Sequence, residues 1–115
     1  MRYASFNAGA GNDKIDISVV TFAGEGGSDA DNVNRWRGQL QLPPMSAEAV
    51  ATQVSPLQTD AATFATADIA GPSARTLAAW TRRNGQAWFF KATGPGPAVE
   101  REKSNFVKFI QSVRF

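Results

Sequence analysis

The dipeptide Asn84-Gly85 constrains the fold of this chain more than any other feature. It separates two aromatic-rich segments, residues 75–83 and 86–94. Asparagine and glycine tolerate the positive φ angles that a type I′ turn requires at both of its central positions. The sequence therefore predicts a β-hairpin in which Asn84 and Gly85 form the whole loop.

A loop of this length fixes which residues face one another across the hairpin. The predicted pairs are Arg83 with Gln86, Thr81 with Trp88, Trp80 with Phe89, and Ala79 with Phe90. One face then carries Trp80, Ala87 and Phe89, and the other carries Leu77, Ala79, Trp88, Phe90 and Ala92. Because large aromatic side chains lie on both faces, the sheet needs cover on both sides.

The rest of the chain supplies further strands and the helices that could cover this sheet. Alternating residues indicate strands at 2–8, 14–23 and 62–69, of which the first two form a hairpin. Apolar residues spaced three and four apart indicate helices at 29–40, 46–54 and 98–112. The expected fold is α+β, with a central antiparallel sheet of about five to six strands and helices on both faces. This is an α/β/α sandwich in the order β-β-α-α-β-β-β-α.

The ends of the first two helices carry local signals. Asp29 or Asp31 is expected to N-cap the first helix, and Pro43-Pro44 is expected to stop it. Ser46 is the expected N-cap of the second helix.

Composition limits the chemistry of the chain. Its 115 residues are enough for one domain, 1–115, with a single core. Cys and His are absent, which excludes zinc sites built from them, thiolate nucleophiles and imidazole catalysis, and no cofactor is expected. The net charge of +2 is too small to indicate a nucleic-acid partner by itself. The N-terminus lacks the apolar core of a signal peptide and begins as a strand. We therefore expect this chain to be a domain of a longer precursor. The alternative is a complete cytosolic protein.

The loop 24–31 is the best candidate for a ligand site. Glu25, Asp29 and Asp31, with the adjacent Asn32, offer hard oxygen ligands for calcium. The spacing matches no EF-hand loop, and the alternative is a solvated loop whose carboxylates cap a helix. The glycines of this loop do not form a phosphate-binding loop, because no Gly-Lys-Ser/Thr motif follows them.

Two other chemistries receive less support. A platform for single-stranded nucleic acid could combine Arg35, Arg37, Arg82, Arg83 and Lys91 with Trp36, Trp80 and Trp88. The tryptophans lie at core spacings, so packing explains them better and no nucleic-acid partner is expected. Asp16 and Asp68 could meet across strands as a carboxylate pair, but nothing in the sequence places them in a cleft. The sequence therefore predicts a protein that is not an enzyme.

Three segments resemble uncharacterised bacterial lipoprotein domains of the PsbP-like kind. They are Asn-x-Asn-Arg-Trp-Arg-x-Gln-x-x-Leu-Pro-Pro at 32–44, Trp-Phe-Phe-Lys-Ala-Thr-Gly at 88–94, and Phe-x-x-Phe-x-x-Ser-Val-Arg-Phe at 106–115. Such domains occur in envelope proteins of planctomycetes and verrucomicrobia. The wider group includes a photosystem subunit and a eukaryotic Ran-binding import factor, so the shared fold carries no shared function.

The resemblance implies a central antiparallel sheet with helices on both faces. It also implies a periplasmic or outer-envelope lipoprotein whose signal peptide and lipobox cysteine precede Met1, so that membrane contact comes only through that anchor; the alternative location is the cytoplasm. We expect a monomeric, non-enzymatic protein-interaction or scaffold domain with an unknown protein partner. The alternative function is binding of a small ligand or a calcium ion by the loop 24–31.

Overall fold

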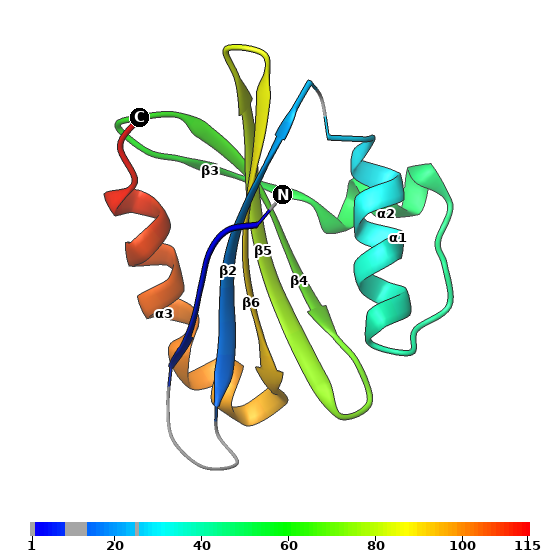
Figure 1. The fold of residues 1–115 in the computed structure, drawn as a ribbon. Helices are drawn as coiled ribbons and strands as arrows, with labels where there is room; N and C mark the ends of the chain where they lie inside the picture. Colours follow the sequence, from blue (N-terminus) through cyan, green and yellow to red (C-terminus); the bar gives the residue numbers. More distant parts are fainter. Residues whose placement is uncertain (1, 9–13, 25) are drawn as a thin grey trace.

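The computed structural model describes residues 2–8, 14–24 and 26–115. Within these residues it shows an α+β fold with one antiparallel sheet and three helices (Figure 1). The elements in chain order are β1 (Arg2–Ala8), β2 (Ile15–Ala23), α1 (Asp29–Gln39), α2 (Ala47–Gln53), β3 (Ser55–Gln58), β4 (Thr63–Ala70), β5 (Ala74–Arg83), β6 (Gln86–Pro95) and α3 (Gly96–Ser112).

The predicted order of elements lacks β3, so the prediction is wrong at this point. The sequence of β3, Ser-Pro-Leu-Gln, is too short to show an alternating pattern, and Pro56 has no backbone N–H. Proline is tolerated in β3 because this strand lies at one edge of the sheet, where it pairs only with β4.

The strands follow the spatial order β1-β2-β6-β5-β4-β3, and every neighbouring pair is antiparallel. The β5–β6 hairpin therefore lies at the centre of the sheet. Its turn has the predicted geometry, since φ is 51° at Asn84 and 75° at Gly85. Trp80 faces Phe89 and the other predicted pairs also hold, which confirms the register.

Each face of the sheet has its own core. Figure 1 shows α3 on one side of the sheet and α1 with α2 on the other. The core beside α3 consists of Ile15, Val19, Phe64, Leu77, Ala79, Phe90, Ala92, Ala98, Val99, Phe106 and Ile110. The core beside α1 and α2 consists of Val33, Trp36, Leu40, Val50, Ala67, Ile69, Ala78, Trp80, Ala87 and Phe89. Large side chains of the hairpin are thus buried on both faces, as its register predicts.

Ser28, rather than Asp29 or Asp31, is the N-cap of α1. Its backbone is extended (φ −80°, ψ 158°), and its hydroxyl accepts a hydrogen bond from the backbone N–H of Asp31 at 3.1 Å. Both aspartates lie in the first turn, where the helix dipole favours a carboxylate. Serine and aspartate are equally good caps, so the sequence alone did not separate them. The predicted N-cap Ser46 of α2 is confirmed.

The loop between α1 and α2 is fixed to α1 by side chains of α1 itself. Asn34 donates from Nδ2 to the carbonyl of Met45 and accepts from its N–H, both at 2.8 Å. Arg37 donates from Nε to the carbonyl of Pro43 at 2.9 Å. Trp36 is buried in the core. These residues of the segment 32–44 therefore have structural roles.

Candidate binding site

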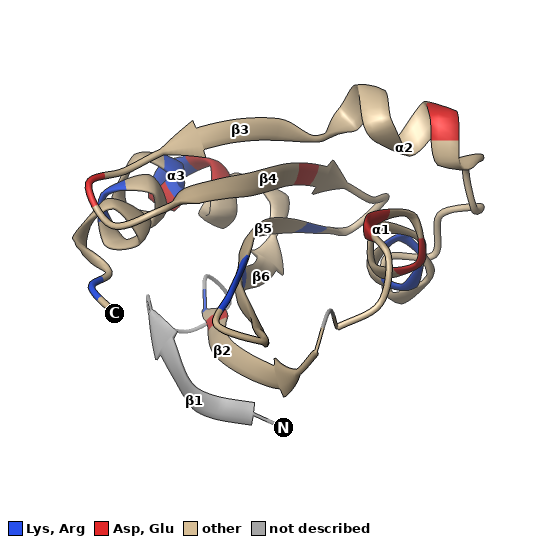
Figure 2. Cartoon of the chain, turned by 90° about the horizontal axis from the view of Figure 1, so that it is seen from above, with Lys and Arg blue, Asp and Glu red and all other residues tan. Residues whose placement is uncertain are grey.

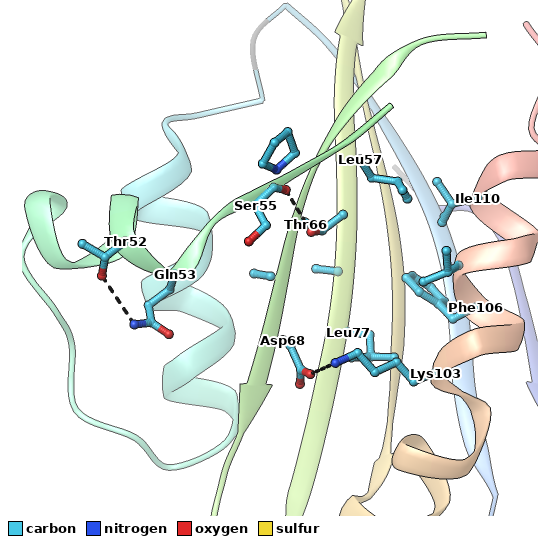
Figure 3. A pocket seen from close by; sticks show the side chains of 14 residues that line it. Thr52, Gln53, Ser55, Leu57, Thr66, Asp68, Leu77, Lys103, Phe106 and Ile110 are labelled. Atoms are coloured by element: carbon cyan, nitrogen blue, oxygen red, sulfur yellow. Dashed lines mark hydrogen bonds and ion pairs between the residues drawn. The ribbon is translucent and has the colours of Figure 1, made fainter. Parts of the chain in front are cut away.

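A cavity of about 430 Å³ lies between α3 and the outer strands β3 and β4. We call it the α3–β4 cleft. Its apolar side chains come from β3, β5 and α3: Leu57, Leu77, Phe106 and Ile110 (Figure 3). Its polar side chains come from the end of α2, from β3, β4 and α3: Thr52, Gln53, Ser55, Thr66, Asp68 and Lys103. The cleft therefore combines an apolar wall with a polar rim.

The cleft exists because α3 and β3 leave part of the sheet uncovered. α3 packs mainly on β6 and β5 rather than on β4. β3 pairs with residues 63–66 of β4 and does not continue along the rest of that strand. The surface of β4 around Asp68 therefore faces open space between the helix and the edge of the sheet.

A network of ion pairs closes one end of the cleft. Asp68 accepts hydrogen bonds from Arg75 Nε at 2.7 Å and from Arg75 Nη2 at 2.6 Å. Lys103 on α3 donates from Nζ to the same carboxylate at 2.8 Å, an interaction drawn in Figure 3. Arg75 also pairs with Glu100 of α3. The network thus links β4 and β5 to α3.

The network keeps the Asp68 carboxylate ionised. Hydrogen bonds from Arg75, together with the pull of Lys103, hold the pKa of Asp68 below its ordinary value against the opposing effect of partial burial. The hydrogen bonds that Arg75 donates to Asp68 also raise the pKa of Arg75. A carboxylate with a lowered pKa is a weak proton acceptor. The cleft is therefore better suited to binding than to acid–base chemistry.

The residues predicted to bind calcium are placed as follows. Asp29 Oδ1 accepts hydrogen bonds from Trp80 Nε1 and from Arg82 Nη2, both at 2.9 Å. Asp31 is exposed in the first turn of α1, and Glu25 lies outside the described residues. No group of three or more acidic residues in the described ranges is arranged to hold a metal ion. Calcium binding stays a prediction, while the contact of Asp29 with Trp80 is a role that the sequence did not reveal.

Asp16 and Asp68, considered from the sequence as a carboxylate pair that could meet across strands, do not lie on neighbouring strands. Asp16 lies on β2 and Asp68 on β4, and both β6 and β5 run between these strands. The two residues therefore cannot share a site across neighbouring strands.

The structure also bears on the tryptophans considered for nucleic-acid stacking. Trp36 and Trp80 are each 1% exposed and pack against one another edge-on, with ring centroids 5.3 Å apart. Buried rings offer no stacking surface, so the interpretation of these two as core residues is confirmed. In the part of the chain that Figure 2 colours, basic and acidic residues are interspersed rather than separated into a basic stripe.

Neither protein-family models nor curated proteins match this sequence. The resemblance to PsbP-like lipoprotein domains therefore rests on the three segments alone and stays a prediction. None of the helices in the described ranges is long and apolar enough to cross a bilayer.

The sequence did not predict the α3–β4 cleft. The signal that could have indicated it is Asp68, the only charged residue in a strand of otherwise small or apolar residues. A lone carboxylate beside an apolar core usually has a basic partner. The partners, Arg75 and Lys103, are 7 and 35 positions away, so only the folded chain identifies both of them.

Proposed function

We propose that this chain is a non-enzymatic protein-interaction domain that binds an apolar side chain of its partner in the α3–β4 cleft. The observation that carries the proposal is the cleft itself. Its volume of about 430 Å³ falls within the usual range for ligand sites. It combines an apolar wall with a few polar groups, the composition that binding sites usually have.

The electrostatics of the rim support binding over catalysis. Asp68 is engaged by Arg75 and Lys103, and its lowered pKa makes it a poor general base. Lys103 is correspondingly paired with a carboxylate, which disfavours its neutral, nucleophilic form. The rim charges largely cancel one another, so the contact energy of a partner would come from the apolar wall.

The cleft can be tested with a library of random short peptides displayed on phage. Val107 lines the cleft from α3 and is partly buried, so Val107→Trp should fill it. Lys108→Trp, at an exposed neighbouring position, is the matched control. We expect the unmodified domain and Lys108→Trp to enrich peptides with a large apolar residue, and Val107→Trp to bind them at least about tenfold more weakly. Absence of enrichment, or equal binding by Val107→Trp, would overturn the proposal.

The proposal extends to the family and location of the domain. We infer a PsbP-like α/β/α sandwich carried by a bacterial envelope lipoprotein, supported by the three matching segments and by the buried aromatic residues on both faces of the sheet. The complete gene product, expressed in its own host with a labelled fatty acid, should incorporate the label and fractionate with the envelope. Recovery of an unlabelled product in the cytoplasm would contradict this location.

Calcium binding by the loop 24–31 is the second candidate. Asn32 is 1% exposed, and its Oδ1 has no hydrogen-bond partner in the described structure, which leaves one oxygen of this region available. A calcium titration followed by amide NMR should shift Asp29, Asp31 and Asn32 if the ion binds there. Unchanged resonances at millimolar calcium would remove this candidate.

A further inference from the structure

The outer edge of β4 is only partly covered. β3 begins at Ser55, which pairs with Thr66, and no described strand lies beside β4 beyond that point. Four residues of β4, 67–70, therefore continue past the end of their outer neighbour. Figure 2 shows β3 beside β4 at the rim of the sheet, with α2 leading into β3.

The register shows which backbone groups of this segment point outward. The N–H of Gly71 donates to the carbonyl of Ala74 at 2.8 Å, so these two residues occupy a hydrogen-bonded position of the β4–β5 ladder. Hydrogen-bonded and non-hydrogen-bonded pairs alternate along an antiparallel ladder. The N–H and C=O groups of Asp68 and Ala70 must then point away from β5, toward the open edge. Both residues are exposed, whereas Ile69 between them is buried.

Two hollows flank this free edge, one on each face of the sheet. The α3–β4 cleft lies on the side toward which Asp68 points, since this side chain reaches Lys103 of α3. A smaller hollow of about 170 Å³ lies on the side of α1, lined among others by Val33, Met45 and Ile69. Residues paired across strands point to the same face, and successive residues alternate between faces. An added strand would thus direct alternate side chains into the two hollows.

We infer that the partner binds as an extended segment that adds a strand to the free edge of β4. This inference rests on the proposed function and specifies how the partner enters the cleft. The backbone of the segment pairs with the backbone of Asp68 and Ala70. The residue opposite Asp68 places a large apolar side chain in the α3–β4 cleft. The next residue of the segment places a small side chain in the hollow beside α1. Main-chain pairing supplies affinity in this mode, and alternate side chains supply specificity.

Charge identifies the occupant as a different chain rather than a second copy of this one. Symmetric antiparallel pairing of two β4 edges would set the Asp68 of one copy opposite Asp68 or opposite Ala70 of the other, and in both registers it would bring the two Asp68 side chains to the same face of the sheet. Like charges at paired positions destabilise a sheet, and the carboxylate would face the apolar wall of Leu77 and Phe106. An uncharged, apolar segment meets neither penalty.

The test uses the peptides enriched by the unmodified domain. Ala70→Pro removes the outward N–H at an edge position, where proline is tolerated, and Ala70→Thr retains it. We expect peptide affinity to fall at least about tenfold for Ala70→Pro and to stay nearly unchanged for Ala70→Thr. Methylation of alternate backbone nitrogens in the peptide should weaken binding to the unmodified domain as well. Bound peptide should slow hydrogen exchange at the amides of Asp68 and Ala70.

The outcomes separate this inference from the proposed function. One outcome is that peptides bind Val107→Trp weakly, bind Ala70→Pro with full affinity and tolerate backbone methylation. Such peptides would occupy the cleft through side chains alone, and this result would overturn strand addition. Absence of any enriched peptide overturns both. Concentration-dependent dimerisation that Ala70→Pro abolishes would show that a second copy occupies the edge, and would also overturn the inference.

Discussion

The contact between Trp36 and Trp80 and the α3–β4 cleft lie on opposite faces of the same sheet and are built in opposite ways. Trp36 also packs on Phe89, at 6.1 Å between ring centroids, and Asp29 satisfies the only polar atom of the Trp80 ring. At the cleft, α3 packs on β5 and β6 and leaves a cavity above β4 that ion pairs border but do not fill. The first region is therefore closely packed, whereas the second keeps an unfilled cavity at the surface.

The largest expected effect comes from opening the tryptophan region. Trp36→Ala should lower the free energy of unfolding by about 3–5 kcal/mol, because it leaves a cavity beside Trp80. Urea denaturation measures the loss. Phe115→Ala is the control: Phe115 contacts Trp88 and Phe64 but is 46% exposed, so its removal leaves no enclosed cavity and should cost clearly less than Trp36→Ala. Equal losses in the two variants would contradict the distinction between packed and open regions.

A medium effect is expected at the polar contact of the same region. Asp29→Leu removes the acceptor of the buried Trp80 Nε1 donor and should cost about 2 kcal/mol. Asp31→Leu, two positions away and exposed, removes a similar carboxylate from the helix N-terminus and should cost only about 0.5 kcal/mol. Chemical denaturation of both variants gives the comparison. A smaller loss for Asp29→Leu than for Asp31→Leu would show that the contact with Trp80 is dispensable.

A smaller stability effect than that of Asp29→Leu is expected at the rim of the cleft. Asp68→Asn should cost about 1 kcal/mol near neutral pH, because the ion pairs are partly exposed and screened by water. The pKa of Asp68 is lowered in the folded state, so its contribution is present above the ordinary value of 3.8 and is lost as the pH falls through the lowered value. The two proteins should therefore converge in stability at acidic pH.

Unfolding curves of the unmodified domain and Asp68→Asn across that range provide the measurement. Asp60→Asn is the control, because Asp60 is 94% exposed and should give no such difference. A gap that persists unchanged to low pH would mean that Asp68 contributes through packing rather than charge.

Much of the fold could be predicted because its main determinants are local. Asn84 and Gly85 determine the type of turn, and the two-residue turn determines the register of the hairpin. Because successive side chains alternate between faces, this register places large side chains on both faces of the sheet. Ser46 could be identified as a cap because no competing cap residue precedes it directly, whereas Ser28 lies beside Asp29.

The features that the sequence did not predict are contacts between residues far apart in the chain and space that the packed elements leave unfilled. The contact of Asp29 with Trp80 joins residues 51 positions apart, and no local pattern encodes it. The α3–β4 cleft arises because β3 begins only opposite Thr66 and α3 lies over other strands. A cavity is set by where elements stop, and a one-residue change in the length of β3 would alter it. For this reason the sequence predicted a ligand site at the loop 24–31 and not at the cleft.

Intermolecular NOEs between an enriched peptide and the labelled domain would show directly whether the α3–β4 cleft receives an apolar side chain of a partner. We expect contacts from the large apolar residue of the peptide to the side chains of Leu57, Phe106 and Ile110. Contacts confined to the exposed rings of Phe22 and Phe115, with none inside the cleft, would contradict this expectation.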